Sequence, residues 1–92
     1  MLKISEDRQD QQAILLRLEG RIIGPWVDEL RDVCESFARN GVKITLDLEE
    51  VVFADDNAVA LLTGLQSRGI TLIRLTPFVE EQMKATVPKP IC

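Results

Sequence analysis

Short apolar runs at the start of the chain predict an antiparallel hairpin. Residues 2–5 and 13–19 are rich in β-prone side chains, and the polar string EDRQDQQ separates them. Because this string offers no apolar side chain to a core, we expect it to form a long, solvated loop between two strands.

A helix is predicted from Pro25 to about Arg39. Proline at the first helical position loses no needed N–H group, and two acids in the first turn complement the helix dipole. Apolar residues spaced i, i+4, i+7, i+8 and i+11 form one stripe facing a core: Trp26, Leu30, Val33, Cys34 and Phe37. We therefore expect Trp26 in the core rather than exposed as an anchor. Asn40 and Gly41 predict a left-handed C-terminal cap.

The middle of the chain predicts a strand, a helix and a further strand. Residues 42–48 alternate strictly between apolar and polar side chains, as in a strand with one face more buried than the other. A second helix is expected from residue 55 or 56 to Gly69, and a strand over residues 70–75 follows it.

A last helix is expected after the Thr-Pro pair at residues 76–77, where threonine supplies the N-cap. Apolar residues repeat every four positions along it, at Val79, Met83 and Val87. Residues 87–92 contain two prolines, so we expect an extended tail there.

This order of elements predicts a small α/β domain. Helical crossovers between strands imply parallel neighbours covered by helices, and the opening hairpin adds an antiparallel pair, so the sheet is mixed. A chain of 92 residues has room for one domain, which we assign to residues 1–92.

Composition indicates a globular, cytoplasmic protein. Hydrophobic residues make up 46% of the chain, too many for a disordered segment. No apolar run approaches the ~18 residues of a membrane span, and the N-terminus lacks the pattern of a signal peptide. Cys34 falls on an apolar helix face and Cys92 in the tail, so neither predicts a disulfide framework or a metal-ligand pair. A homodimer, linked through Cys92 or otherwise, stays open.

The net charge of −4 argues against nucleic acid as the main partner. The acids are unevenly placed, because five of the fifteen lie between positions 47 and 56 with no basic residue among them: Asp47, Glu49, Glu50, Asp55 and Asp56. We expect Asp47, Glu49 and Glu50 to form an acidic patch.

The residue types favour a non-enzymatic protein without a cofactor. Histidine and tyrosine are both missing from the sequence, and no serine or cysteine has a candidate base to activate it. The acids match no calcium loop and lack its turn glycine, so we expect no metal site. Asp47 could be a phosphate acceptor, but no strand-end lysine follows in the expected place.

A purely structural role explains only part of the acidic cluster. Asp55, Asp56 and Asn57 fall where a helix has unpaired N–H groups, and a cap stabilises by roughly 0.5 to 2 kcal/mol. Capping this helix requires only one of these three side chains, so the other two are available for another role.

The stretch LDLEEVVFADDNAVALL resembles the signature of the STAS family (sulfate transporter and anti-sigma factor antagonist domains). That signature has a strand ending in Asp-Leu, a short connector, and then Asp-Ser-Ser-Gly opening a helix. The alignment needs no gap: Asp55 matches the aspartate, Asp56 and Asn57 the two serines, and Ala58 the glycine. LRLEGRI, before the first predicted helix, resembles the family's second strand.

This resemblance implies a STAS-like fold and a regulatory, protein-binding function. Anti-sigma factor antagonists of the family dock on a kinase through this loop, and the kinase phosphorylates the second serine to abolish binding. The same role would fall here on Asp55, Asp56, Asn57 and Ala58. Because Asn57 occupies the phosphoacceptor position, and a one-residue shift offers only Ala58, the switch is expected to be missing. Asp56 would place a fixed charge beside that position and mimic the modified state in part.

The resemblance leaves other binding functions open. Some STAS domains are accessory subunits of membrane transporters or of ATPases that transport lipids or anions, and some bind nucleotides. The partner is therefore either a kinase-like ATPase (an anti-sigma factor) or a transporter ATPase.

Overall fold

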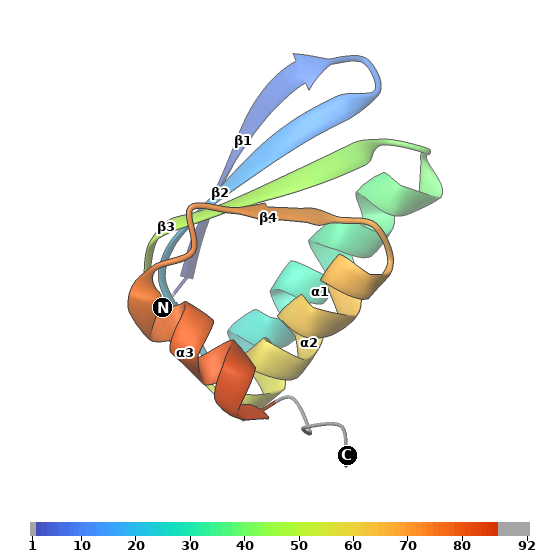
Figure 1. The fold of residues 1–92 in the computed structure, drawn as a ribbon. Coiled ribbons are helices and arrows are strands. Elements are labelled where there is room, and N and C mark those ends of the chain that lie inside the picture. The colour runs from blue at the N-terminus through green and yellow to red at the C-terminus, as the bar shows by residue number, and fades with distance from the viewer. Residues whose placement is uncertain (1, 87–92) are drawn as a thin grey trace.

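The computed structural model describes residues 2–86 and consists of one four-stranded sheet and three helices (Figure 1). The elements in chain order are β1 (Leu2–Asp10), β2 (Ala13–Ile22), α1 (Pro25–Arg39), β3 (Lys43–Ala54), α2 (Asp56–Ser67), β4 (Thr71–Ile73) and α3 (Pro77–Thr86). This confirms the predicted order of strands and helices.

The sheet is mixed, as the sequence predicts. Its strand order is β1-β2-β3-β4, with β1 antiparallel to β2 and the pairs β2·β3 and β3·β4 parallel. Figure 1 shows α1 and α2 side by side on one face of the sheet and α3 beside the end of β3, next to α2. The core lies between the sheet and these helices.

The long hairpin loop predicted for EDRQDQQ is wrong. β1 continues to Asp10 and β2 begins at Ala13, so only Gln11 and Gln12 connect them. β1 is an edge strand, and the side chains of residues 6–10 are exposed. A strand held by backbone pairing needs no apolar side chain there, and charges on an edge also discourage pairing with other chains.

Helix α1 has the predicted bounds, and Gly41 has the left-handed φ of 73° expected after its end. The buried line along the helix consists of Val27, Leu30 and Cys34. Trp26 is half-buried and packs against the edge of the core, so the prediction of a core tryptophan is corrected. Val27, one residue later, takes the central position because the buried face is rotated relative to the predicted stripe.

Strand β3 is one continuous strand with two bulges. At two register shifts against β2, β3 contains one residue more than its partner. Each extra residue reverses the alternation of faces, so Leu48, Val51 and Ala54, three apart, all point into the core. The residue pairs 49–50 and 52–53, between them, are exposed. The residues after Leu48, where the STAS signature has a connector, are therefore part of the strand.

α2 and α3 begin as predicted and β4 begins one residue later than predicted, while α2 and β4 end sooner. Helix α2 ends at Ser67 rather than Gly69, and β4 ends at Ile73 because Arg74 has a φ of 54° and turns the chain. Thr76 caps α3, since its hydroxyl oxygen accepts a hydrogen bond from the Val79 N–H at 3.2 Å. The predicted tail, residues 87–92, lies outside the described residues. No helix within residues 2–86 is long and apolar enough to cross a membrane.

Burial makes the Cys34 thiol a probe of core packing. Loss of solvation raises the pKa of Cys34 from 9.0 to about 11, with Glu35 adding to the effect and Arg68 opposing it. Between pH 9 and about 11 the thiol ionises in the unfolded chain but not in the folded one, which favours unfolding. The contribution of the neutral thiol to the free energy of unfolding is therefore fully present below pH 9 and is lost as the pH rises toward 11. We expect the loss to reach about 2 to 3 kcal/mol.

Urea unfolding between pH 8 and 11 measures this loss, and Cys34→Val is the control that removes the titrating group. If both proteins lose stability equally over this range, the thiol is not buried as described.

Candidate functional site

Asp55 links the start of α2 to the start of α1 through its side chain and to β2 through its backbone. Its Oδ1 accepts a hydrogen bond from the Ala58 N–H at 2.8 Å, and its Oδ2 accepts one from the Gly24 N–H at 3.1 Å. The Asp55 N–H donates to the Ile22 carbonyl oxygen at 3.1 Å. Asp55 is thus the N-cap of α2 and also holds the connection between β2 and α1. Gly24 has a φ of 53°, a conformation that favours glycine.

The four residues predicted to bind a partner differ in accessibility. Asp56 and Asn57 are exposed on the first turn of α2. Asp55 is half-buried and uses both carboxylate oxygens internally. Ala58 is fully buried, and its predicted contact with a partner is corrected because a side chain with 0% exposure offers no contact area. The accessible part of the motif is therefore Asp56 and Asn57.

The strand end before this turn is held by α3. The Gln82 side chain donates to the Ala54 carbonyl oxygen at 2.8 Å, and its Oε1 accepts from the Ala54 N–H at 3.3 Å. Beside it, the rings of Phe53 and Phe78 lie 6.0 Å apart. Gln82 was not among the predicted site residues, although a signal exists: it lies three residues after Val79, on the apolar face of a helix.

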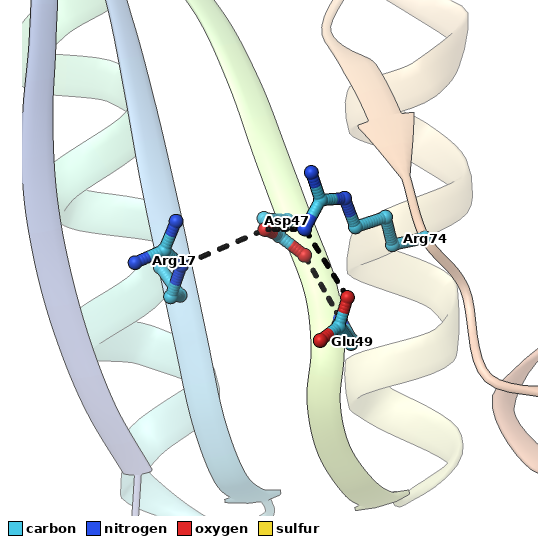
Figure 2. Close-up of polar contacts among 4 residues, drawn as sticks. All are labelled: Arg17, Asp47, Glu49 and Arg74. Carbon is cyan, nitrogen blue, oxygen red and sulfur yellow. Dashed lines mark hydrogen bonds and ion pairs between the residues drawn. The ribbon is translucent and has the colours of Figure 1, made fainter.

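The predicted acidic patch does not form as one surface. Asp47 lies between the core-facing Leu46 and Leu48, so its side chain points to the opposite face of the sheet, where it is only 1% exposed. Its carboxylate lies 3.6 Å from Arg17 and 3.8 Å from Arg74 and accepts a hydrogen bond from the Glu49 N–H at 3.0 Å (Figure 2).

Two arginines thus balance part of the acidic run. Arg74 Nη1 also contacts Glu49 Oε2 at 3.2 Å, while Glu50 is exposed. The predicted patch of Asp47, Glu49 and Glu50 is corrected, because one acid is buried, one is paired and one faces solvent. The enclosure of Asp47 also keeps it from being accessible as a phosphate acceptor.

A groove of about 650 Å³ runs between α1 and α2 and begins at the same turn. Asn57 lines one end and Arg68 the other, and Gly24, Leu61 and Gly64 lie along it. Within residues 2–86, no group of three or more histidine, cysteine or acidic side chains is placed to hold a metal ion.

The structure matches solved anti-sigma factor antagonists. No family model and no curated protein matches the sequence. The anti-sigma factor antagonist SpoIIAA in its unphosphorylated form superimposes with a TM-score of 0.71 at 19% identity, over 91% of this chain and 82% of that one. An anti-sigma factor antagonist STAS domain from Rhodobacter sphaeroides gives 0.54 at 15% identity, over 95% and 96%. The chain has the STAS fold, which confirms the predicted fold class.

Replacing Asp55 tests its bridging role. We expect Asp55→Ala to lower the free energy of unfolding by about 1 to 2 kcal/mol, because the variant loses the cap and leaves the Gly24 N–H without this acceptor. Asp56→Ala, at the exposed next position, is the matched control and should change it by less than about 0.5 kcal/mol. Urea denaturation measures both, and equal losses would mean that the cap is shared.

Replacing Asp47 tests the contacts of its buried carboxylate with two arginines whose side chains are about half exposed. We expect Asp47→Asn to destabilise by about 1 kcal/mol, since the amide keeps the shape but removes the charge that faces two arginines, which are themselves about half exposed to solvent. Glu50→Gln, an exposed neighbour on the same strand, should cost almost nothing. High salt should reduce the Asp47→Asn effect in part, because the carboxylate is buried but both arginines are open to screening ions. An Asp47→Asn effect no larger than that of Glu50→Gln would mean that these ion pairs contribute nothing to stability.

Proposed function

We propose that this chain is a non-enzymatic, regulatory protein-interaction module that docks on a protein partner through Asp56 and Asn57. The observation that carries the proposal is the division of roles at the start of α2. Asp55 already serves as the cap, so Asp56 and Asn57 are exposed without a capping task. The STAS fold shared with anti-sigma factor antagonists supports a regulatory binding role.

The proposed contact is constant rather than switched. Asn57 stands at the position of the phosphoacceptor serine in the STAS motif, and a carboxamide has no hydroxyl to phosphorylate. Asp56 keeps a single negative charge at the positive end of the helix dipole, where it complements the free N–H groups of the first turn. A basic side chain on the partner would therefore find the same charge at all times. We infer an ATPase partner of the anti-sigma-factor, kinase-like kind.

Binding and stability separate the contact role from a structural one. We expect Asp56→Ala combined with Asn57→Ala to abolish partner capture from cells of the native host while changing the melting temperature little, because neither side chain is buried. The control pair Glu6→Ala and Gln9→Ala, exposed on β1, should retain capture.

Three results would count against this proposal. Unchanged capture by the double variant excludes the first turn of α2 as the contact. A parallel loss of capture and stability assigns both residues to folding. Recovery of a transporter ATPase in place of a kinase-like ATPase favours the role of accessory transport subunit.

Phosphorylation mapping tests the missing switch. Between positions 53 and 63 only Thr63 carries a hydroxyl, and it is half-buried on α2. We expect peptides covering this range, isolated from native cells, to carry no phosphate. A phosphopeptide at Thr63 would show that the module is regulated at this helix after all. A synthetic phosphopeptide carrying phosphothreonine at position 63, added to the digest, is the control for recovery of modified peptides.

A further inference from the structure

The groove between α1 and α2 has an apolar floor and open space above it. Val27 and Leu65 close the floor from the core side, and Leu61 is half-buried along it. From Asn57 to Arg68 the groove follows α2 for eleven residues, or about 17 Å at 1.5 Å per residue. This length matches about three turns of another helix.

The far end of the groove is basic in a protein whose net charge is −4. Arg68 is exposed and lines this groove and two smaller hollows that adjoin it. Across the three hollows, four basic side chains accompany two acidic ones: Arg31, Arg39, Lys43 and Arg68 with Asp28 and Glu35. Asp28 is paired with Arg31 at 2.7 Å, which leaves the basic excess around Arg68.

Gly64 keeps the groove open. A glycine inside a helix costs about 1 kcal/mol relative to alanine. Apart from the neighbouring residues and the backbone of its own helix, no described atom lies within 4 Å of a Cβ at this position, so packing against other parts of the described chain does not require glycine here. A larger side chain would project into the groove and fill it. The absence of a side chain at Gly64 allows a side chain or backbone of another molecule to come close to α2 here.

We propose that this groove receives an amphipathic helix of the partner, with apolar side chains over Leu61 and Gly64 and carboxylates against Arg68. This deepens the proposed function and rests on it, since the helix would belong to the protein that contacts Asp56 and Asn57. Acidic Asp56 at one end and basic Arg68 at the other would fix the direction of the incoming helix, because its reversal would place like charges together.

A convex element fits this site better than a second copy of the chain. Two copies meeting groove to groove would leave both hollows facing each other as a void, whereas stable interfaces pack as densely as protein interiors. A helix with side chains is about 10 Å across and can fill such a groove.

Site-specific photocrosslinking in cells of the native host tests the site. The photoreactive residue p-benzoylphenylalanine replaces Ala60, which is exposed on the groove, in one protein and Asp56 in another. In the second protein Asn57 keeps part of the proposed contact, and the covalent crosslink captures the weakened complex. A third protein carries it at Gln9 on the edge strand as the control. We expect positions 56 and 60 to label the same partner protein and position 9 not to label it. Mass spectrometry should place the crosslink from position 60 in an amphipathic helical segment that contains acidic residues.

Two substitutions should each lower the crosslink yield from position 60 several-fold while the protein stays folded, which a cooperative melting transition above the labelling temperature shows. Arg68→Glu reverses the charge at the basic end, and Gly64→Met fills the groove. Gly64→Ala and Arg8→Glu, the latter on β1, are the matched controls and should leave the yield unchanged. Unchanged yields with Arg68→Glu and Gly64→Met would overturn the proposal.

The crosslinks also separate this inference from the proposed function. Labelling from position 56 but not from position 60 overturns the groove site and leaves the proposed contact standing. Labelling from neither position removes both. A crosslink from position 60 to a second copy of the chain, or to a segment without acidic residues, overturns the groove proposal alone.

Discussion

The arrangement of the site depends on one carboxylate, that of Asp55, which accepts hydrogen bonds from two different elements. One oxygen binds the first turn of α2 and the other binds the Gly24 N–H at the start of α1. Both helices therefore begin at the same place, beside the ends of β2 and β3, and the groove between them opens there. Because this single side chain satisfies the cap, the exposed Asp56 and Asn57 are free to act on other molecules.

The sheet beneath this turn uses its charges internally. The two bulges in β3 let apolar residues three apart face the core and leave the pairs between them exposed. Asp47 points away from the core and is covered by arginines from β2 and from the turn after β4. Arg74 adopts its left-handed φ of 54° while contacting two acids, and these contacts help to offset the cost of that conformation.

Local signals in the sequence predicted the helices well, but they did not predict the contacts between residues that are distant in the sequence. The bounds of α1, the start of α2 and the cap of α3 follow from neighbouring residues such as Pro25 and Thr76, because capping is a local interaction. The paired edge strand through EDRQDQQ was missed because backbone pairing does not depend on side-chain type. The bulges of β3 were missed because they are defined against β2, which is distant in the sequence.

The candidate site was predictable in its position and not in its charge. The STAS-like motif located the turn, but no residue next to the acids indicated that Arg17 and Arg74, distant in the sequence, would contact them. Of the five acids between positions 47 and 56, Asp47, Glu49 and Asp55 are engaged within the fold, which leaves Glu50 and Asp56 as exposed charges. A partner approaching α2 would therefore meet one acid at the start of the helix and a basic end at Arg68, rather than a broad acidic surface. A surface with opposite charges at its two ends fixes the orientation of a bound partner. It discriminates less between partners that differ only in net charge.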